Sequence, residues 1–375
     1  MKVVVILPTY NEKENLEKII PLLEEEVFPK VTNHEMHILV ADDSSPDGTA
    51  EVVKKLMEKW KNLHLNTGEK KGLGAAYIRA MRYGIENLGA EVFFEMDADG
   101  QHDATKIPEF LQKIDEGYDM VIGTRYSGGG SIPQNWPIQR KIFSVCGNLL
   151  VRSILMRFSI HDWTGGYRAL KKEVFLKEEK GLEAFPSYTF QIAFLHKTLS
   201  SGFKVAEVPF HFGDRAFGKS KFPAIEYIIN ALTYVITARI KELLTGSFGK
   251  FLVVGGLGFF IQLIVYRLLL NATKFPLGID NILAAQLAIF SNYNLNNLWT
   301  FKERRASGAG SYLLKMAGFF ATSNIGVILI QSGIIQVGEF LYGRKYPTVY
   351  FVVGTAVLLV WNFAMYSLVI WRKKK

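Results

Sequence analysis

Two carboxylates, one residue apart, follow a short apolar run in the first half of the chain. Residues 92–103 read Val-Phe-Phe-Glu-Met-Asp-Ala-Asp-Gly-Gln-His-Asp, so Asp97 and Asp99 come directly after a strand-like segment. In open α/β sheets, ligands bind just beyond the carboxyl ends of the strands. Because alternate side chains of an extended chain point the same way, Asp97, Asp99 and the amide of Gln101 are expected to converge. Such oxygen ligands suit Mg²⁺ or Mn²⁺, although an acidic turn is the alternative interpretation.

A repeated order of strand, loop and helix surrounds this pair. Apolar runs at 3–7 and 38–41 are each followed by a polar loop and then by apolar residues at helical spacing. A Gly-rich turn at 71–74 opens a third helix, after which come a strand at 92–96 and a further strand at 120–123. Strands that alternate with helices indicate a parallel sheet covered on both faces. We therefore expect an α/β, Rossmann-like domain that carries the aspartates at its sheet edge.

Seven short motifs in roughly the first 220 residues carry a family resemblance. They are P-T-Y-N-E (8–12), D-D-S-S-P-D-G-T (42–49), G-L-G-A-A-Y (72–77), D-A-D-G-Q-H-D (97–103), G-T-R-Y (123–126), D-W-T-G-G-Y-R (162–168) and R-A-F-G-K-S-K (215–221). In this order they resemble the GT-A-fold, family-two inverting glycosyltransferases, and most of all the dolichol- or polyprenol-phosphate mannose synthases. One motif alone is weak, whereas seven in register make a chance match improbable.

The resemblance implies an activity and its substrates. It implies inverting transfer of mannose from GDP-mannose to dolichyl (polyprenyl) phosphate, giving a β-linked lipid-phosphate mannose, with Mg²⁺ or Mn²⁺ as cofactor. Direct displacement at the sugar requires no general base, because a phosphate monoester is already largely dianionic near neutral pH. Gly100 and Gln101 stand where mannose synthases often have Leu-Ser. The same reaction with UDP-glucose or a related sugar nucleotide therefore remains open.

The resemblance also assigns roles to individual residues. Those expected to bind the donor are Pro8, Tyr10, Glu12, Val40, Asp42, Asp97, Ala98, Asp99, Gln101, Arg215 and Lys221. Those expected to hold the metal are Asp97, Asp99 and Gln101, and those expected to contact the acceptor phosphate are Arg125, Arg140, Ser144 and Arg168. The expected catalytic residues are Asp99, Arg125, Arg215 and Lys221, the last two in a stretch whose guanidinium, glycine and ammonium suit a phosphate clamp. His102 is expected to support the site or lie on the surface rather than act as a catalyst.

The end of the chain differs from the rest in charge and hydropathy. Residues 1–245 have a net charge of −1 and residues 246–375 a net charge of +10. The tail contains four apolar stretches long enough to cross a bilayer, which takes about 20 residues: Phe248–Leu270, Ile279–Phe301, Tyr312–Leu341 and Val349–Trp371. We expect a GT-A domain at 1–221, an amphipathic interface helix and linker at 222–246, and an all-α, GtrA-like transmembrane domain of four spans at 247–375. A second amphipathic stretch, Ile138–Phe158, is expected to lie in the membrane interface or, alternatively, to pack on the sheet.

Basic residues orient the expected membrane domain. Lys302, Arg304 and Arg305 follow the second stretch and Arg372-Lys373-Lys374-Lys375 end the chain, so both segments, and with them the catalytic domain, are expected in the cytoplasm. The expected partners are membrane lipid, the donor and the lipid acceptor, with no nucleic acid. Asparagines at 292, 294, 296 and 297 either line a path for a lipid-linked sugar or join the helices. A lipid-sugar translocase with a regulatory soluble half is thus a further interpretation.

Overall fold

The computed structural model describes the chain except for residues 186–187, 215–223, 273–276, 344–345 and 373–375. The chain divides into two compact units, Met1–Thr237 and Ala238–Lys375. Arg215 and Lys221, which the sequence assigns to a phosphate clamp, lie outside the described residues.

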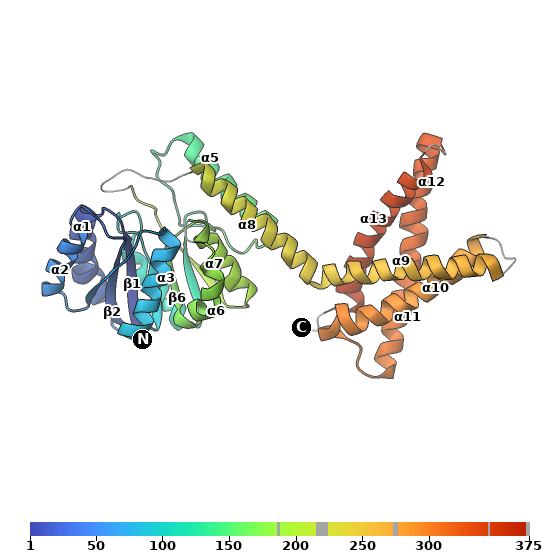
Figure 1. The fold of residues 1–375 in the computed structure, drawn as a ribbon, viewed down its shortest axis with the longest axis horizontal. Helices are drawn as coiled ribbons and strands as arrows, with labels where there is room; N and C mark the ends of the chain where they lie inside the picture. Colours follow the sequence, from blue (N-terminus) through green and yellow to red (C-terminus); the bar gives the residue numbers. More distant parts are fainter. Residues whose placement is uncertain (186–187, 215–223, 273–276, 344–345, 373–375) are drawn as a thin grey trace. The chain divides into compact units, whose positions relative to one another are not determined.

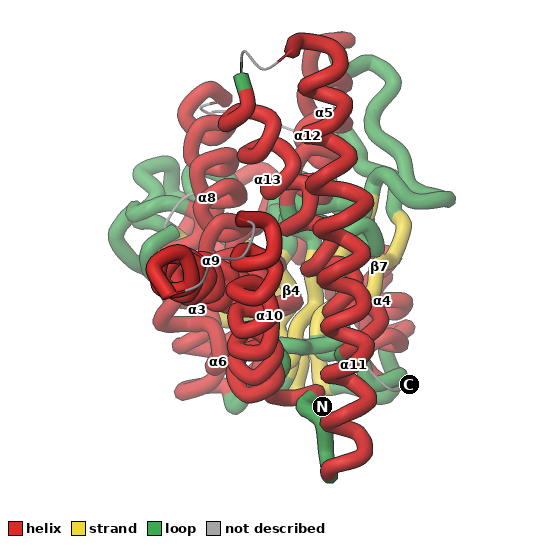
Figure 2. Tube along the Cα trace, turned by 90° about the vertical axis from the view of Figure 1, so that its right-hand side faces the viewer, coloured by secondary structure: helices red, strands yellow, loops and turns green. Residues whose placement is uncertain are grey.

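A seven-stranded sheet forms the centre of the first unit (Figure 2). Its strands are β1 (Lys2–Thr9), β2 (Glu35–Asp42), β3 (Leu63–Thr67), β4 (Val92–Glu95), β5 (Met120–Thr124), β6 (Arg168–Lys171) and β7 (Val205–Pro209), in the order β3-β2-β1-β4-β6-β5-β7. The expected parallel pairing is found for all neighbours except β6, which runs antiparallel to both β4 and β5. Because of this reversal, β6 begins at the edge where β4 and β5 end.

Helices cover both faces of this sheet (Figure 1). One face carries α1 (Lys13–Leu22), α2 (Thr49–Lys59) and α4 (Ile107–Asp115), and the other carries α3 (Leu73–Tyr83), α6 (Lys172–Leu182) and α7 (Thr189–Ser200). Short helical segments adjoin them at η1 (Leu23–Val27), η2 (Phe28–Lys30), η3 (Gly84–Leu88) and η4 (Ala104–Lys106). Successive residues of a strand point to opposite faces of the sheet, so Val5 packs in one apolar core and Ile6 packs in the other. The expected α/β fold is confirmed. The polar residues predicted for the site lie at the carboxyl ends of the strands, outside the two apolar cores.

Two helices coincide with the stretches predicted to be amphipathic, α5 (Ile138–Ile154) and α8 (Ala224–Thr245). Within α5, Asn148 and Val151 are buried, whereas Ile138 and Phe143 are 73% and 65% exposed. Leu149 is also exposed. The helix therefore presents an extensive apolar surface away from the core of its own unit.

Every secondary-structure element that the structure describes in the second unit is a helix. It contains α9 (Ser247–Ala272), α10 (Leu277–Leu295), η5 (Asn296–Thr300), η6 (Lys302–Arg304), α11 (Ala309–Ile325), η7 (Gly326–Gln331), α12 (Ser332–Tyr342), α13 (Pro347–Met365) and η9 (Tyr366–Ile370). Its core is an aromatic cluster built around Tyr293, Phe319 and Trp371. Asn297 adjoins this cluster and accepts the indole N–H of Trp371 at 3.1 Å. This asparagine joins two segments of the unit.

The four apolar stretches predicted from the sequence all fall on helices of this unit. Among the residues that the structure describes, no single helix meets the combined requirements of length and apolarity for a span. One pair, Glu226–Thr245 with Ser247–Gln262, meets them jointly but is bent by 53°.

Candidate functional site

The described residues predicted to bind the donor lie on or just after three adjacent strands that end at one edge of the sheet. Thr9 of β1 lies opposite Asp42 of β2, and Ile6 of β1 lies opposite Glu95 of β4. Pro8 and Val40 lie within the last residues of β1 and β2. Tyr10 and Glu12 follow β1 directly, just as Asp97 follows β4. Residues far apart in the sequence are therefore brought to a common edge, as the strand order requires.

Asp42 is held in place by the loop that follows its own strand. The backbone N–H of Ser45 donates to Oδ2 at 3.1 Å, and the Ser45 hydroxyl donates to Oδ1 at 2.5 Å. The hydroxyl of Thr9 adds a longer bond of 3.3 Å. On the neighbouring loop, the ammonium of Lys70 lies 3.3 Å from the centre of the Tyr10 ring, a cation–π contact. The side chains expected beside the nucleotide thus have defined positions.

Asp97 and Asp99 occupy the expected place after β4. Asp99 is buried and its Oδ1 accepts the backbone N–H of Gln101 at 3.1 Å, whereas the Asp97 side chain is 40% exposed. The Gln101 side-chain amide donates to the carbonyl of Gly213 at 3.2 Å. Two carboxylates and an amide oxygen are hard donors that fit Mg²⁺ or Mn²⁺. In the described part of the chain no three His, Cys, Asp or Glu side chains gather as a metal site, so a metal bound here would take its further ligands from phosphate oxygens or water.

His102 supports the aspartate loop from inside. Its Nδ1 accepts the backbone N–H of Asp97 at 3.0 Å, and its ring stacks on Tyr167 with centres 4.9 Å apart. Burial lowers the pKa of His102 to about 4, although the Asp99 carboxylate acts in the opposite direction. The imidazole is therefore neutral near pH 7 and helps to fix the loop, in agreement with its expected supporting role.

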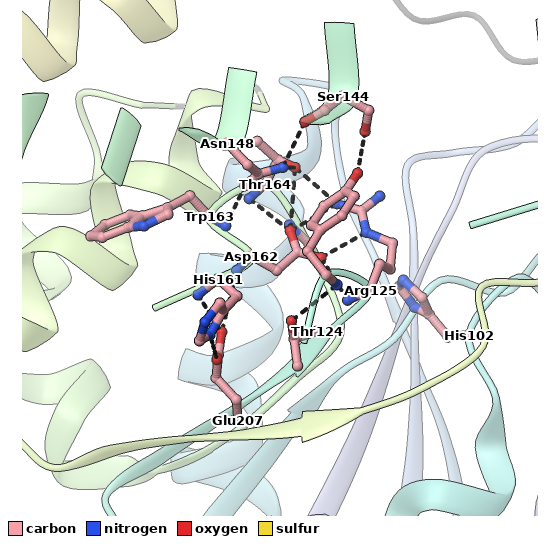
Figure 3. Close-up of polar contacts among 12 residues, drawn as sticks. His102, Thr124, Arg125, Ser144, Asn148, His161, Asp162, Trp163, Thr164 and Glu207 are labelled. Carbon is pink, nitrogen blue, oxygen red and sulfur yellow. Dashed lines mark hydrogen bonds and ion pairs between the residues drawn. The ribbon is translucent and has the colours of Figure 1, made fainter. Parts of the chain in front are cut away.

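Arg125 follows β5 and forms a buried ion pair with Asp162 (Figure 3). The two side chains are only 9% and 0% exposed. A second bond joins the Arg125 guanidinium to the hydroxyl of Thr164 at 2.8 Å. Burial disfavours both charges, but the pairing outweighs it, so the pKa of Arg125 is raised and the pKa of Asp162 is lowered. Both groups are charged near neutral pH and balance each other.

Asp162 is a residue that the sequence reasoning did not assign to the site. It is the first residue of the D-W-T-G-G-Y-R motif. The signal that could have identified it is an acidic residue in a motif that also contains an arginine, Arg168. The backbone around it is tied to neighbouring elements, since the N–H groups of His161 and Asp162 both donate to Glu207 of β7. From α5, Asn148 accepts the backbone N–H of Trp163 at 2.6 Å (Figure 3). This loop is therefore anchored on two sides.

The remaining residues predicted for the acceptor phosphate fall in two places. Arg140 is exposed on α5, with its guanidinium 3.7 Å from the centre of the Trp136 ring. Ser144, also on α5, shares a hydrogen bond with the hydroxyl of Tyr126, the residue after Arg125. Arg168, by contrast, is fully buried at the start of β6. The structure thus brings Arg125 and Ser144 into one region and places Arg168 in the interior.

Arg168 faces Glu95 across the antiparallel pairing of β4 and β6. The two residues are register partners and both are 0% exposed. Burial raises the pKa of Glu95 to about 7, and the facing Arg168 counters part of this rise. A buried acid and a buried base therefore lie side by side on neighbouring strands, and the acid stands two residues before Asp97.

Comparisons with known proteins agree with the motifs. Residues 4–177 match the model of glycosyl transferase family 2, and residues 250–371 match the GtrA/DPMS transmembrane domain. The chain is 36% identical over 317 residues to a dolichol-phosphate mannosyltransferase of Pyrococcus furiosus, covering 84% of this chain and 85% of that protein. It is 39% identical over 222 residues to a polyprenol monophosphomannose synthase of Mycolicibacterium smegmatis, covering 59% and 80%. It is 35% identical over 247 residues to an undecaprenyl-phosphate mannosyltransferase of Micrococcus luteus, covering 65% and 98%.

These matches assign both units. The first unit is a family 2 glycosyltransferase domain with an α/β fold, and the second contains a GtrA/DPMS transmembrane domain, so the protein is a membrane protein. The expected family and fold are confirmed. The chain belongs to family 2 of the glycosyl transferases, in the group that also carries a GtrA/DPMS transmembrane domain.

Proposed function

We propose that the protein transfers mannose from GDP-mannose to dolichyl or polyprenyl phosphate, with inversion to a β-linked product. The observation that carries this proposal is the order of groups along the sheet edge. Asp97 and Asp99 follow β4, with Tyr10 and Asp42 on the β1–β2 side and Arg125 on the β5 side. The relatives support the sugar and the acceptor, because their names combine mannose with dolichol phosphate, polyprenol or undecaprenyl phosphate.

On the donor side, the base and ribose are assigned to the ends of β1 and β2. The residues are Pro8, Tyr10, Glu12, Val40 and Asp42, and Asp97 with Ala98 would contact the nucleotide. Since Ser45 and Thr9 donate to the Asp42 carboxylate, that carboxylate is already oriented before the donor binds. Such pre-organisation lowers the entropy cost of binding.

A divalent metal would be held by Asp97, Asp99 and Gln101. When bound, Mg²⁺ or Mn²⁺ supplies positive charge that stabilises the departing diphosphate. The chain keeps these ligands in place in two ways: the neutral ring of His102 accepts the backbone N–H of Asp97, and the Gln101 side-chain amide donates a hydrogen bond to the carbonyl of Gly213. The buried position of Asp99 favours a fixed ligand over a mobile one.

On the acceptor side, the chain positions a nucleophile that is already ionised. The lipid phosphate is largely dianionic near neutral pH, and a neutral His102 is therefore not required as a base. Arg125, Arg140 and Ser144 are assigned to the acceptor phosphate, with Arg215 and Lys221 as further cations outside the described residues. Because Asp162 already balances the charge of Arg125, Arg125 would contribute to acceptor binding by orienting the phosphate more than by adding net positive charge.

The membrane brings the acceptor to this edge of the sheet. The exposed apolar side chains of α5, together with Arg140 on the same helix, suit the interface where acyl chains meet phosphate headgroups. We assign α5 and α8 to that interface, four spans to the second unit, and the catalytic unit to the cytoplasmic side.

The test is transfer of radiolabelled sugar to a polyprenyl phosphate by the full chain in detergent. GDP-mannose and UDP-glucose are compared as donors, each with Mn²⁺ or EDTA. Metal-dependent labelling from GDP-mannose alone is expected, with an acid-labile product whose β configuration is determined by NMR. Labelling from UDP-glucose would replace the sugar and keep the site, and labelling from neither would contradict the proposed transfer.

A further inference from the structure

A buried polar cluster lies directly behind the two aspartates of the metal site. Its charged members are Glu95, the last residue of β4, and Arg168, the first residue of β6. They are register partners, and neither is exposed to solvent. Burying two charges is costly, and apolar residues of similar volume in such a place are often as stabilising or more so. A contribution to stability alone is therefore a weak explanation for this pair.

Two polar side chains from helices complete the cluster. Tyr77 of α3 and Gln191 of α7 are both buried, and the side-chain amide of Gln191 lies against Gly166, where an added Cβ would be 3.3 Å from Nε2. The Tyr77 hydroxyl and two Arg168 nitrogens have no direct hydrogen-bond partner within the described part of the chain, and the Gln191 amide interacts with the Glu95 carboxylate. Such concentrations of buried polar atoms are rare in a core and point to a specific role.

The cluster is joined to both sides of the site. Glu95 stands two residues before Asp97, so a shift of its side chain acts on the start of the aspartate loop. Arg168 Nε donates to the carbonyl of Gly165 at 3.1 Å. The N–H of the same Gly165 donates at 3.1 Å to Asp162, the partner of Arg125. This buried pair thus adjoins the segment that carries the predicted metal ligands and the loop that carries Asp162, the partner of Arg125.

We propose that Glu95 and Arg168 are positioning residues, whose facing charges set the place of the Asp97–Asp99 loop relative to the 162–167 loop. This inference rests on the proposed function for the ligands of those loops. It gives Arg168 a role in the interior instead of the predicted contact with the acceptor phosphate. Neither side chain touches a substrate; both act through the loops that they adjoin.

The experiment compares single and double neutral variants of the full chain in detergent. The variants are Glu95→Gln, Arg168→Met and the double variant, with Arg168→Lys as the conservative change. The control is Lys171→Met, at the other end of β6, where Lys171 faces Val92 and pairs with Asp119 at 3.4 Å. For each protein three quantities are measured: the melting temperature, the affinity for Mn²⁺ with GDP by electron paramagnetic resonance, and KM for donor and acceptor.

If the pair has a positioning role, the double variant is expected to recover the melting temperature of the wild type but not its Mn²⁺ affinity. Either single change leaves an unpaired buried charge and lowers the melting temperature, whereas the double change removes both charges and restores it. The Mn²⁺ affinity is expected to fall about 10–100-fold in both single variants and to stay low in the double variant. Arg168→Lys is expected to recover part of the affinity, and Lys171→Met to leave it unchanged.

Three results would overturn the inference. Recovery of both melting temperature and Mn²⁺ affinity in the double variant would make the pair purely structural. An Arg168→Met effect confined to the acceptor KM would restore the phosphate contact predicted from the sequence. If the wild type does not bind Mn²⁺, the Asp97–Asp99 loop is not a metal site, and the pair has no metal ligands to position. If the wild type binds Mn²⁺ with GDP but transfers no mannose, the proposed function fails, while the binding data still decide the inference.

Discussion

The carboxylate of Asp162 meets the guanidinium of Arg125 along two parallel bonds. Nε lies 2.7 Å from Oδ2 and Nη2 lies 2.8 Å from Oδ1, while the backbone N–H of Arg125 donates to Oδ2 at 3.1 Å. Such a bidentate pair fixes the plane of the guanidinium as well as its distance. Because Arg125 directly follows β5, the pair transmits the position of that strand to the loop that begins at Asp162.

The first prediction concerns the loss of one partner of this pair. Asp162→Asn leaves a buried guanidinium uncompensated, which costs about 3–5 kcal/mol. For a unit of this size we expect the melting temperature to fall by about 6–20 °C, with a parallel loss of transfer activity. Differential scanning fluorimetry checks the shift. The control is Asp119→Asn, whose pair with Lys171 is partly exposed and worth about 0–1 kcal/mol; equal shifts in both variants would contradict the buried-pair explanation.

The second prediction separates a metal ligand from a neighbouring structural aspartate. Asp99→Asn removes a buried charge from the predicted metal site, and the Mn²⁺ affinity is expected to fall by more than the roughly 10–100-fold typical of an outer partner. Asp103→Asn serves as the matched control, because Asp103 accepts the backbone N–H of Thr105 at 3.0 Å and begins the helical turn η4. Asn caps a helical turn about as well as Asp, so that change is expected to leave both stability and Mn²⁺ binding nearly unchanged. The reverse pattern would move the metal site away from Asp99.

The third prediction is a pH dependence at the other end of the sheet. The rings of His37 and His64 stack, with Nδ1 of the first 3.1 Å from Nε2 of the second. Burial, and then the charge of His37, lower the pKa of His64 below its usual 6.5. Below pH 6.5 the unfolded chain therefore binds a proton that the folded chain refuses, so stability falls as the pH decreases.

The measurement is the melting temperature from about pH 7.5 to about pH 5.5, a range that spans the usual histidine pKa. The wild type is expected to lose stability toward the acid end. His64→Gln removes this titrating group and is expected to reduce the slope, leaving the share contributed by buried His102, whose pKa is also lowered. An equally steep slope in the variant would assign the pH dependence to other groups.

Local sequence patterns were sufficient for the strands that are apolar throughout. β1, β2, β4 and β5 were predicted, because each contains a run of residues that are buried on both faces. β3, β6 and β7 were not. Leu63–Thr67 and Val205–Pro209 mix apolar and polar residues, and Arg168–Lys171 is short and begins with a charged residue. The antiparallel direction of β6 depends on its neighbours in space, which no local pattern specifies.

The same distinction applies to the site. Asp97 and Asp99 were predicted because their chemistry and their position after a strand are both visible within a few residues. The pairing of Arg125 with Asp162 joins residues 37 positions apart, and it required the fold. The burial of Arg168 also depends on the sheet, because a motif arginine has the same sequence signal at a phosphate site and in a core.

The fourth prediction contrasts two glycines that differ only in their surroundings. Gly74, near the start of α3, lies so close to α7 that an added Cβ would be 2.8 Å from Cβ of Phe190 and would also contact the carbonyl of Phe185. Gly74→Ala is therefore expected to cost about 1–3 kcal/mol. Gly147, inside α5, has nothing within reach of an added Cβ among the described residues, so Gly147→Ala is expected to add about 0.5–1 kcal/mol. Shifts of the same sign in thermal melts of the two variants would contradict the packing argument.

The last prediction addresses the asparagines of the second unit. The Asn297 side-chain oxygen accepts both the indole N–H of Trp371 at 3.1 Å and the backbone N–H of Ala306 at 2.9 Å. Trp371 also stacks on Phe301, with ring centres 4.7 Å apart. For Asn297, joining the end of the chain to the loop before α11 is therefore the role that its contacts favour over lining a path.

Asn297→Ala leaves two N–H groups without this acceptor and is expected to destabilise the unit by about 1–3 kcal/mol. Trp371→Phe keeps a ring for the stack but loses one hydrogen bond and, because Trp371 is fully buried, also leaves a cavity, so it is expected to be destabilising as well. Asn324→Ala is the control, because the Asn324 amide donates to the carbonyl of Phe320 within its own helix. Thermal melts in detergent rank the three variants. If Asn297→Ala left the melting temperature unchanged and instead abolished movement of the lipid product across a proteoliposome membrane, the path interpretation would replace the structural one.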